Sequence, residues 1–224
     1  MNRCQSMKRI IKAILDIFPD SISSALLFYI RNIKGKKMAE VWEKNGRKGA
    51  PPHIVKQKIV AGFGKRFHCK TLVESGTFQG DMVQAQKNNF ELIYSIELSP
   101  ELRQKAARRF RGTKHIKIIQ GDSGKVIPEI MPLLKGKTLF WLDGHYSGGI
   151  TAKGEKECPI FEELDAILGH NQLKHVILID DARLFNGTHD YPELDDLFAY
   201  VTSKLNDYGP SFVENDIICF LPND

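Results

Sequence analysis

The 224-residue chain contains only four cysteines, and no two of them form a Cys-x-x-Cys pair: Cys4, Cys69, Cys158 and Cys219. This scarcity argues against a disulfide framework and against a zinc site built from thiolates. The chain also opens without the basic segment, apolar core and cleavage site that mark a secretory signal. Together these absences favour a reduced, cytoplasmic protein.

No apolar run in the sequence approaches the ~20 residues that span a bilayer, so a membrane span is not expected. An excess of positive charge is confined to the first part of the chain. Residues 1–70 hold 16 Lys and Arg against 4 Asp and Glu (+12), whereas residues 71–224 hold 16 against 23 (−7). We expect residues 1–55 to form a basic helical arm with a linker, and residues 56–224 to form one domain.

Residues 7–37 of the arm mix short apolar stretches with Lys and Arg, as an amphipathic helix does. The favoured interpretation is a helix that packs its apolar face on the main domain. The alternative is peripheral contact with an anionic membrane surface or an acidic partner. No nucleic acid partner is expected, because the basic charge lies in the arm and no aromatic and basic platform accompanies the strand ends.

From residue 71 onward, apolar runs alternate with helical patterns: TLVES, LIYSIEL, IKIIQ, TLFWLD and HVILID. Such runs are typical of parallel strands that are buried on both faces. The clearest helix begins at Ser99-Pro100 and is closed by Gly112. Asn215-Asp216 is expected to form the turn between two short terminal strands. The order predicts an α/β fold: a doubly wound, mostly parallel sheet with an antiparallel C-terminal hairpin.

Ligands of such sheets bind beyond the carboxyl ends of the strands. After the first strand, the stretch VESGTFQGD has the spacing G-x-x-x-G at Gly76 and Gly80, and it lacks the G-x-G-x-x-G of a dinucleotide loop. Phe78 stands where that loop has its second glycine. The sequence therefore disfavours a dinucleotide.

The next two strand ends indicate a nucleoside. Glu97 lies 21 positions after Gly76, a spacing that suits an acceptor for ribose hydroxyls, and a solvated carboxylate is the alternative. Asp122 and Ser123 receive an adenine amino group or cap the following helix. Together these residues outline a nucleoside site without a pyrophosphate cradle.

The fourth and fifth strands end in acidic residues. Asp143 and His145 follow the fourth strand, and Asp180 and Asp181 follow the fifth. Carboxylates at one edge of a sheet repel one another unless a cation or a proton lies between them. Oxygen ligands of this kind suit Mg²⁺ or a similar hard cation. The alternative is that one carboxylate caps a helix and another is solvated.

Residues 71–221 resemble the class I S-adenosylmethionine-dependent methyltransferases, most closely the cation-dependent O-methyltransferases and the methyltransferase-like proteins of sugar and antibiotic tailoring. The likeness rests on VESGTFQGD, IELSPEL, GDS, LDGHYSGG and IDDARLF. It implies a Rossmann-like seven-stranded sheet and S-adenosylmethionine as cofactor. The implied cofactor residues are Glu74, Ser75, Gly76, Thr77, Phe78, Gly80, Glu97, Leu98, Asp122, Ser123 and Asp143.

In the metal-dependent members, residues equivalent to Asp143, Asp180 and Asp181 bind Mg²⁺, so the resemblance implies a metal site there. The lysine that many members carry three positions after the strand-four aspartate is replaced by Tyr146. His145 is the predicted base beside Asp143, since an unperturbed histidine titrates near pH ~6.5. Its alternative role is to orient a carboxylate.

The expected activity is methyl transfer to a hydroxyl of a small molecule or a saccharide, assisted by a divalent cation. A glycosyltransferase is the rival enzyme, because clustered aspartates with a cation also bind nucleotide sugars. A nucleoside-binding scaffold without turnover is the rival outside enzymology. Binding of S-adenosylmethionine rather than a nucleotide sugar distinguishes the methyltransferase from the glycosyltransferase. Turnover distinguishes the methyltransferase from the scaffold.

Overall fold

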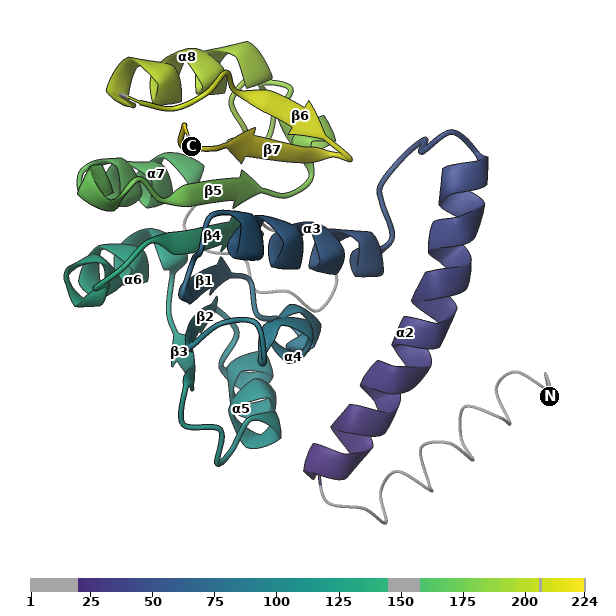
Figure 1. Ribbon diagram of the computed structural model, residues 1–224. Helices are drawn as coiled ribbons and strands as arrows, with labels where there is room; N and C mark the ends of the chain where they lie inside the picture. Colours follow the sequence, from purple (N-terminus) through teal and green to yellow (C-terminus); the bar gives the residue numbers. More distant parts are fainter. Residues whose placement is uncertain (1–19, 145–157, 206, 224) are drawn as a thin grey trace.

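The centre of the molecule is a twisted sheet, shown in Figure 1. The computed structural model describes residues 20–144, 158–205 and 207–223, and within them seven strands lie in the order β3-β2-β1-β4-β5-β7-β6. The strands are β1 Thr71–Ser75, β2 Leu92–Glu97, β3 Ile116–Gln120, β4 Thr138–Leu142, β5 Val176–Ile179, β6 Phe212–Glu214 and β7 Ile217–Phe220. Strands β1 to β5 are parallel, and β7 runs antiparallel to both of its neighbours. The predicted fold class is confirmed.

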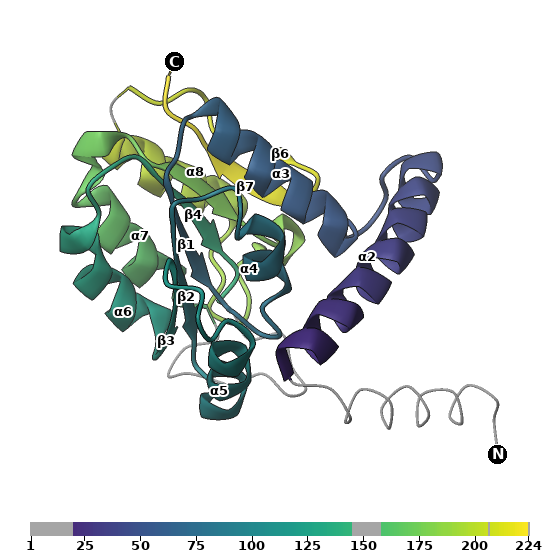
Figure 2. The same ribbon diagram turned by 60° about the horizontal axis from the view of Figure 1, so that its bottom comes forward.

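Helices cover both faces of the sheet (Figure 2). The helices are α2 Asp20–Lys44, α3 His53–Arg66, α4 Asp81–Gln86, α5 Pro100–Arg109, α6 Ser123–Ile130, α7 Ile160–Leu168 and α8 Leu194–Lys204, with 3₁₀ turns at Met131–Leu133, Asn171–Leu173 and Ala182–Leu184. Helices α3, α4 and α5 lie on one face, and α6, α7 and α8 lie on the other. Successive side chains of a strand therefore enter different cores: Leu139 and Trp141 pack under the first layer, Phe140 and Leu142 under the second. This two-sided burial explains the continuous apolar runs of the sequence.

Local sequence signals fix the ends of several elements. The Ser99 hydroxyl accepts a hydrogen bond from the Leu102 amide at 3.4 Å, and α5 begins at the next residue, Pro100, as predicted. At the terminal hairpin, Asn215 and Asp216 have φ angles of 51° and 63°. Two successive left-handed residues are what a type I′ turn requires, so the predicted turn is confirmed.

The described part of the arm is the long helix α2, which packs against α3 and α5 and stands at the side of the domain in Figure 1. Trp42 is its buried anchor, and Phe28 lies beneath the guanidinium of Arg109 at 5.6 Å. Residues 45–52 connect it to α3, with left-handed backbone at Gly46, Arg47 and Gly49. Helix α2 therefore packs on the domain along one side, but not by a continuous apolar face, because Ile22, Leu26, Tyr29 and Ile33 are exposed.

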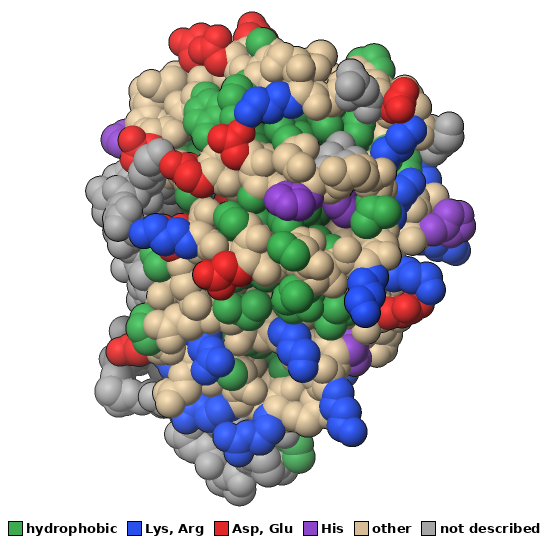
Figure 3. Space-filling view, turned by 90° about the vertical axis from the view of Figure 1, so that its left-hand side faces the viewer, with side chains coloured by type: hydrophobic (Ala, Val, Ile, Leu, Met, Phe, Trp, Pro, Cys, Tyr) green, Lys and Arg blue, Asp and Glu red, His purple; other side chains and the backbone are tan. Residues whose placement is uncertain are grey.

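Figure 3 shows the face seen from the left of Figure 1. Lys and Arg side chains gather over its lower end, and Asp and Glu side chains lie mainly above them. Apolar side chains are scattered between polar ones on this face. Within the part of the chain that the structure describes, none of the helices combines the length and the apolar character that a bilayer span requires.

Candidate active site

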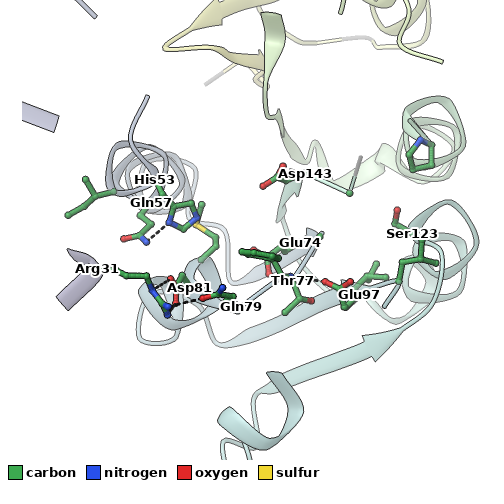
Figure 4. A pocket seen from close by; sticks show the side chains of 18 of the residues that line it. Arg31, His53, Gln57, Glu74, Thr77, Gln79, Asp81, Glu97, Ser123 and Asp143 are labelled. Carbon is green, nitrogen blue, oxygen red and sulfur yellow. Dashed lines mark hydrogen bonds and ion pairs between the residues drawn. The ribbon is translucent and has the colours of Figure 1, made fainter. Parts of the chain in front are cut away.

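A cavity of about 720 Å³ lies at the carboxyl ends of the parallel strands. Its floor and sides come from the ends of β1, β2, β3 and β4, and helices α2 and α3 close it from outside. All predicted cofactor residues line it except Ser75 and Gly80. In Figure 4, Arg31 and His53 lie at one side of the cavity and Ser123 at the other, with Glu74, Thr77 and Glu97 between them.

The loop after β1 can approach a ligand closely because of Gly76. This residue has φ 84°, and a Cβ placed on it would come 2.2 Å from the Asp143 carbonyl oxygen. Any side chain here would push apart the ends of β1 and β4. Gly80, with φ 74°, precedes α4 and packs against Phe110, so it shapes the wall without reaching the cavity. Ser75 also supports the wall without lining the cavity. Its hydroxyl accepts a hydrogen bond from the Asp143 amide at 3.2 Å, which ties the end of β1 to the end of β4.

Phe78 carries strain at the cavity. Its φ angle is 48°, a left-handed value that is rare for a bulky residue. The Phe78 amide donates to Glu97 Oε2 at 2.7 Å, which holds the loop in this conformation. Strained backbone of this kind persists where the surroundings determine it, often at ligand sites.

Glu97 is fixed by two backbone donors. Besides the Phe78 amide on Oε2, the Ser99 amide donates to Oε1 at 2.9 Å. The carboxylate is nearly buried and lines the cavity. Each carboxylate oxygen has a second lone pair, so Glu97 can still accept hydrogen bonds from a ligand hydroxyl.

Glu74 is a buried carboxyl group within the cavity wall. Burial raises its pKa to about 8, although a hydrogen bond from the Ser95 hydroxyl opposes the shift. Ser95 also lies 2.6 Å from the Thr77 hydroxyl, so the three side chains form one chain of hydrogen bonds. At neutral pH the carboxyl is mostly protonated and can donate as well as accept.

At the end of β3, the capping role of Asp122 is confirmed, and the adenine contact of Asp122 and Ser123 stays a prediction. Asp122 Oδ1 accepts a hydrogen bond from the Gly124 amide at 3.0 Å, so Asp122 caps α6 and also lines the cavity. Ser123 lies beside Glu163 of α7, which is absent from the residues predicted from sequence. Burial raises the pKa of Glu163 to about 7, and hydrogen bonds with Ser123 and Ser75 oppose the shift.

The three predicted metal ligands come together at one edge of the cavity. One carboxylate oxygen from each of Asp143, Asp180 and Asp181 lies within 4.8 Å of the others. Burial raises the pKa of Asp143, with a further contribution from Asp180, and raises that of Asp180 to about 6. Of the three residues, only Asp143 lines the cavity. His145, the predicted base, lies outside the described residues.

A lysine from α3 occupies this cluster. Lys56 Nζ lies 2.5 Å from Asp180 Oδ2 and 3.0 Å from Asp181 Oδ1, and its side chain is 11% exposed. Lys56 was not predicted as a site residue. The available signal was its position beside Gln57 and Val60 on the buried side of a helix, where a lysine needs a charged partner.

Helix α2 supplies the outer wall of the cavity, which the family resemblance does not cover. Arg31 donates to Asp81 Oδ1 and to Gln79 Oε1 at 2.8 and 2.7 Å. From α3, Gln57 and His53 line the cavity and lie 2.8 Å apart. The arm thus forms part of the site, and sequence patterns at the strand ends gave no sign of it.

No family model matches the chain, and no curated protein matches it in sequence. Solved structures do match. The O-methyltransferase TomG from Streptomyces achromogenes, in complex with S-adenosylmethionine, is 15% identical with a TM-score of 0.53, over 85% of this chain and 89% of its own. The S-adenosylhomocysteine-bound methyltransferase PaMTH1 from Podospora anserina is 13% identical with a TM-score of 0.55, over 100% and 98%.

A third structure, an O-methyltransferase from Bacillus cereus in complex with S-adenosylhomocysteine, is 12% identical with a TM-score of 0.54, over 83% of this chain and 90% of its own. The shared architecture is the Rossmann-like fold of class I methyltransferases that the resemblance in sequence implies. At these identities the likeness establishes the fold alone.

Proposed function

We propose that this chain is an S-adenosylmethionine-dependent methyltransferase that acts on a hydroxyl group of a small molecule or a saccharide. The observation that carries the proposal is the cavity itself, which gathers the predicted cofactor residues from four strand ends. The neighbouring folds with bound S-adenosylmethionine or S-adenosylhomocysteine support it.

The residues present suit this cofactor. Gly76 leaves room for a ligand to approach the backbone, as the methionine part requires, beside Glu74 and Thr77. Glu97 is oriented to accept hydrogen bonds from the ribose hydroxyls. Asp122 lies at the adenine end of this arrangement.

The bound cofactor would supply an electrophilic methyl group on a sulfonium: the S–C bond breaks with its electron pair left on sulfur, an O–C bond forms, and the hydroxyl proton passes to a base. Asp143 borders the cavity beside Gly144 and is the proposed contact on the acceptor side. His145 remains the proposed base. The walls from α2 and α3 exclude water and orient the acceptor.

The resemblance also implies a divalent cation at the three aspartates. Asp143, Asp180 and Asp181 offer oxygen atoms that suit Mg²⁺. The ammonium of Lys56 is paired with Asp180 and Asp181, so these residues do not fit a divalent cation while Lys56 stays in place. We therefore assign no step to a metal. The cytoplasmic location and the lack of a nucleic acid partner remain predictions.

Calorimetric titration with S-adenosylmethionine and S-adenosylhomocysteine tests the proposed cofactor. We expect both to bind in a one-to-one ratio, and uridine or guanosine diphosphate not to bind. Binding of a nucleoside diphosphate in their place would favour the glycosyltransferase. Binding of S-adenosylmethionine without turnover across a panel of hydroxyl acceptors would favour the scaffold.

A further inference from the structure

The acidic cluster already contains a cation that belongs to the chain. Lys56 Nζ contacts one carboxylate oxygen of Asp180 and one of Asp181, at 2.5 and 3.0 Å. The lysine side chain is 11% exposed, and those of Asp180 and Asp181 are 2% and 15% exposed. The contacts therefore lie away from bulk water, where charge pairing matters most.

This arrangement uses the oxygens that a divalent ion would need. Mg²⁺ binds oxygen ligands at about 2.0–2.1 Å in near-octahedral geometry. An ion that reached the oxygens of Asp180 and Asp181 contacted by Lys56 would lie close to the ammonium, with like charges facing each other. The ion and the ammonium thus compete for the same place.

The position of Lys56 follows from the packing of α3. Ile54, Gln57 and Val60 of this helix are buried against the domain, and Lys56 lies among them. The residue is separated from its partners by 124 and 125 positions in the chain, so the contact depends on the tertiary fold. It therefore joins helix α3 to the end of β5.

We propose that the ammonium of Lys56 takes the place of the divalent cation, so that the chain neither needs nor binds a metal at Asp143, Asp180 and Asp181. Lys56 is a positioning residue that holds Asp180 and Asp181 in place beside Asp143. Only the turnover measurement rests on the proposed methyl transfer. The metal-binding measurement is independent of it.

Manganese is the probe, because bound Mn²⁺ is detected directly by electron paramagnetic resonance. The full chain, treated with chelator, is titrated with Mn²⁺ alone, together with Lys56→Met and the control Lys58→Met. Lys58 is exposed on the same helix. Methionine keeps the unbranched shape of the side chain, is one atom shorter and removes the charge, which leaves Asp180 and Asp181 without their cation.

We expect the wild type and Lys58→Met to leave Mn²⁺ free at millimolar concentration, and Lys56→Met to bind one Mn²⁺ at least tenfold more tightly. Lys56→Met/Asp180→Asn should lose this gain. A wild type that binds one Mn²⁺ as tightly as Lys56→Met would overturn the proposal, and so would a folded Lys56→Met that binds none.

Two further readouts do not depend on the folding of Lys56→Met. Mn²⁺ should not raise the melting temperature of the wild type, and a rise that Asp143→Asn abolishes would contradict the proposal. Wild-type turnover should be unchanged by chelator, and loss of turnover restored by Mn²⁺ would also contradict it. Failure to bind S-adenosylmethionine would count against the proposed function alone, because the Mn²⁺ titration contains no cofactor.

Discussion

Arg31 of helix α2 forms an ion pair with Asp81, the first residue of helix α4, 50 positions further along the chain. Arg31 Nη2 donates a hydrogen bond to Asp81 Oδ1 at 2.8 Å, and Arg31 Nε lies 2.6 Å from Asp81 Oδ2 as an ion pair. Arg109 Nη1 also lies 2.8 Å from Asp81 Oδ1. Asp81 thus links helix α2 to helices α4 and α5 at the rim of the cavity.

Replacing Arg31 by Ala should loosen this wall without unfolding the domain, because Asp81 keeps Arg109 as a partner. We expect the affinity for S-adenosylmethionine to fall by about tenfold, or ~1.4 kcal/mol, the size of one good charge-assisted pair. Residues 45–52 should also become more sensitive to protease. Calorimetry and limited proteolysis measure the two effects.

The control for this prediction is Lys37→Ala, since Lys37 is exposed on the same helix and lies outside the cavity. It should behave as the wild type in both measurements. Unchanged affinity and unchanged proteolysis of Arg31→Ala would mean that the ion pair does not hold the wall.

Glu97→Gln should weaken S-adenosylmethionine binding by roughly 10- to 100-fold, as expected when a buried charged acceptor of ligand hydroxyls is lost. The amide offers one acceptor oxygen where two backbone amides now donate, from Phe78 and Ser99. Calorimetry provides the measurement, and Glu101→Gln in the exposed first turn of α5 is the matched control. Equal binding by both variants would remove Glu97 from the ribose site.

Much of the fold was predictable because its signals are local. Burial of the strands on both faces produces continuous apolar runs, and the turn at Asn215-Asp216 needs residues that tolerate a left-handed backbone. The meeting of Asp143 with Asp180 and Asp181 was predictable for a different reason. Parallel strands bring their carboxyl ends to one edge, so sequence order suffices to place these residues there.

The contributions of Lys56 and Arg31 could not be predicted in this way. Each depends on a contact between elements far apart in sequence, and a lysine or arginine on a helix is usually solvated. Glu163 is a similar case, since its role appears only once α7 packs beside Ser75 and Ser123. The roles of residues on helices α2, α3 and α7 become visible only in the three-dimensional fold, because no motif at the strand ends includes them.

The outer side of α2 carries an apolar stripe: Ile22, Leu26, Tyr29 and Ile33 are 42% to 63% exposed and share one face of the helix. Arg31, which reaches the rim of the cavity, points to the other side. We predict that this stripe lies on an anionic membrane surface, because the exposed residues Lys36 and Lys37 continue the same helix outside the cavity.

Sedimentation with vesicles tests the membrane contact. The full chain should bind vesicles that contain phosphatidylserine, and binding should weaken in high salt. Leu26→Ser/Ile33→Ser should reduce binding several-fold, and the control Leu133→Ser, at another exposed apolar position, should not. If the wild-type protein binds none of the vesicles, the predicted membrane contact is wrong. A concentration-dependent dimer lost in the double variant would instead assign the stripe to a second copy of the chain.

Glu74 should couple cofactor binding to pH. In the free protein its pKa is raised to about 8 by burial, so the carboxyl is protonated at neutral pH. The positive charge of S-adenosylmethionine near this group would favour the carboxylate and lower the pKa, so that binding releases a proton. Affinity should therefore rise with pH, by up to about tenfold per unit, and level off above about 8.

The raised pKa of Glu74 also affects the stability of the protein without cofactor. Whereas the affinity for cofactor rises with pH, the free energy of unfolding falls as the pH rises. Protonated Glu74 contributes stability that is complete below its ordinary pKa of 4.5 and is lost as the pH rises through about 8. Glu74→Gln, which is neutral throughout, should flatten both profiles and make the protein more stable than the wild type above about pH 8.

Calorimetry at neutral pH in phosphate and in Tris detects the released proton, because the two buffers take up protons with different enthalpies. The binding enthalpy of the wild type should differ between the buffers, and that of Glu74→Gln should not. Glu163→Gln is the matched control, since Glu163 is also buried with a raised pKa, near 7, yet does not line the cavity. It should keep the difference between buffers. If Glu163→Gln loses that difference and Glu74→Gln keeps it, the proton comes from Glu163, and the charge of the cofactor is sensed at the Ser123 end of the cavity.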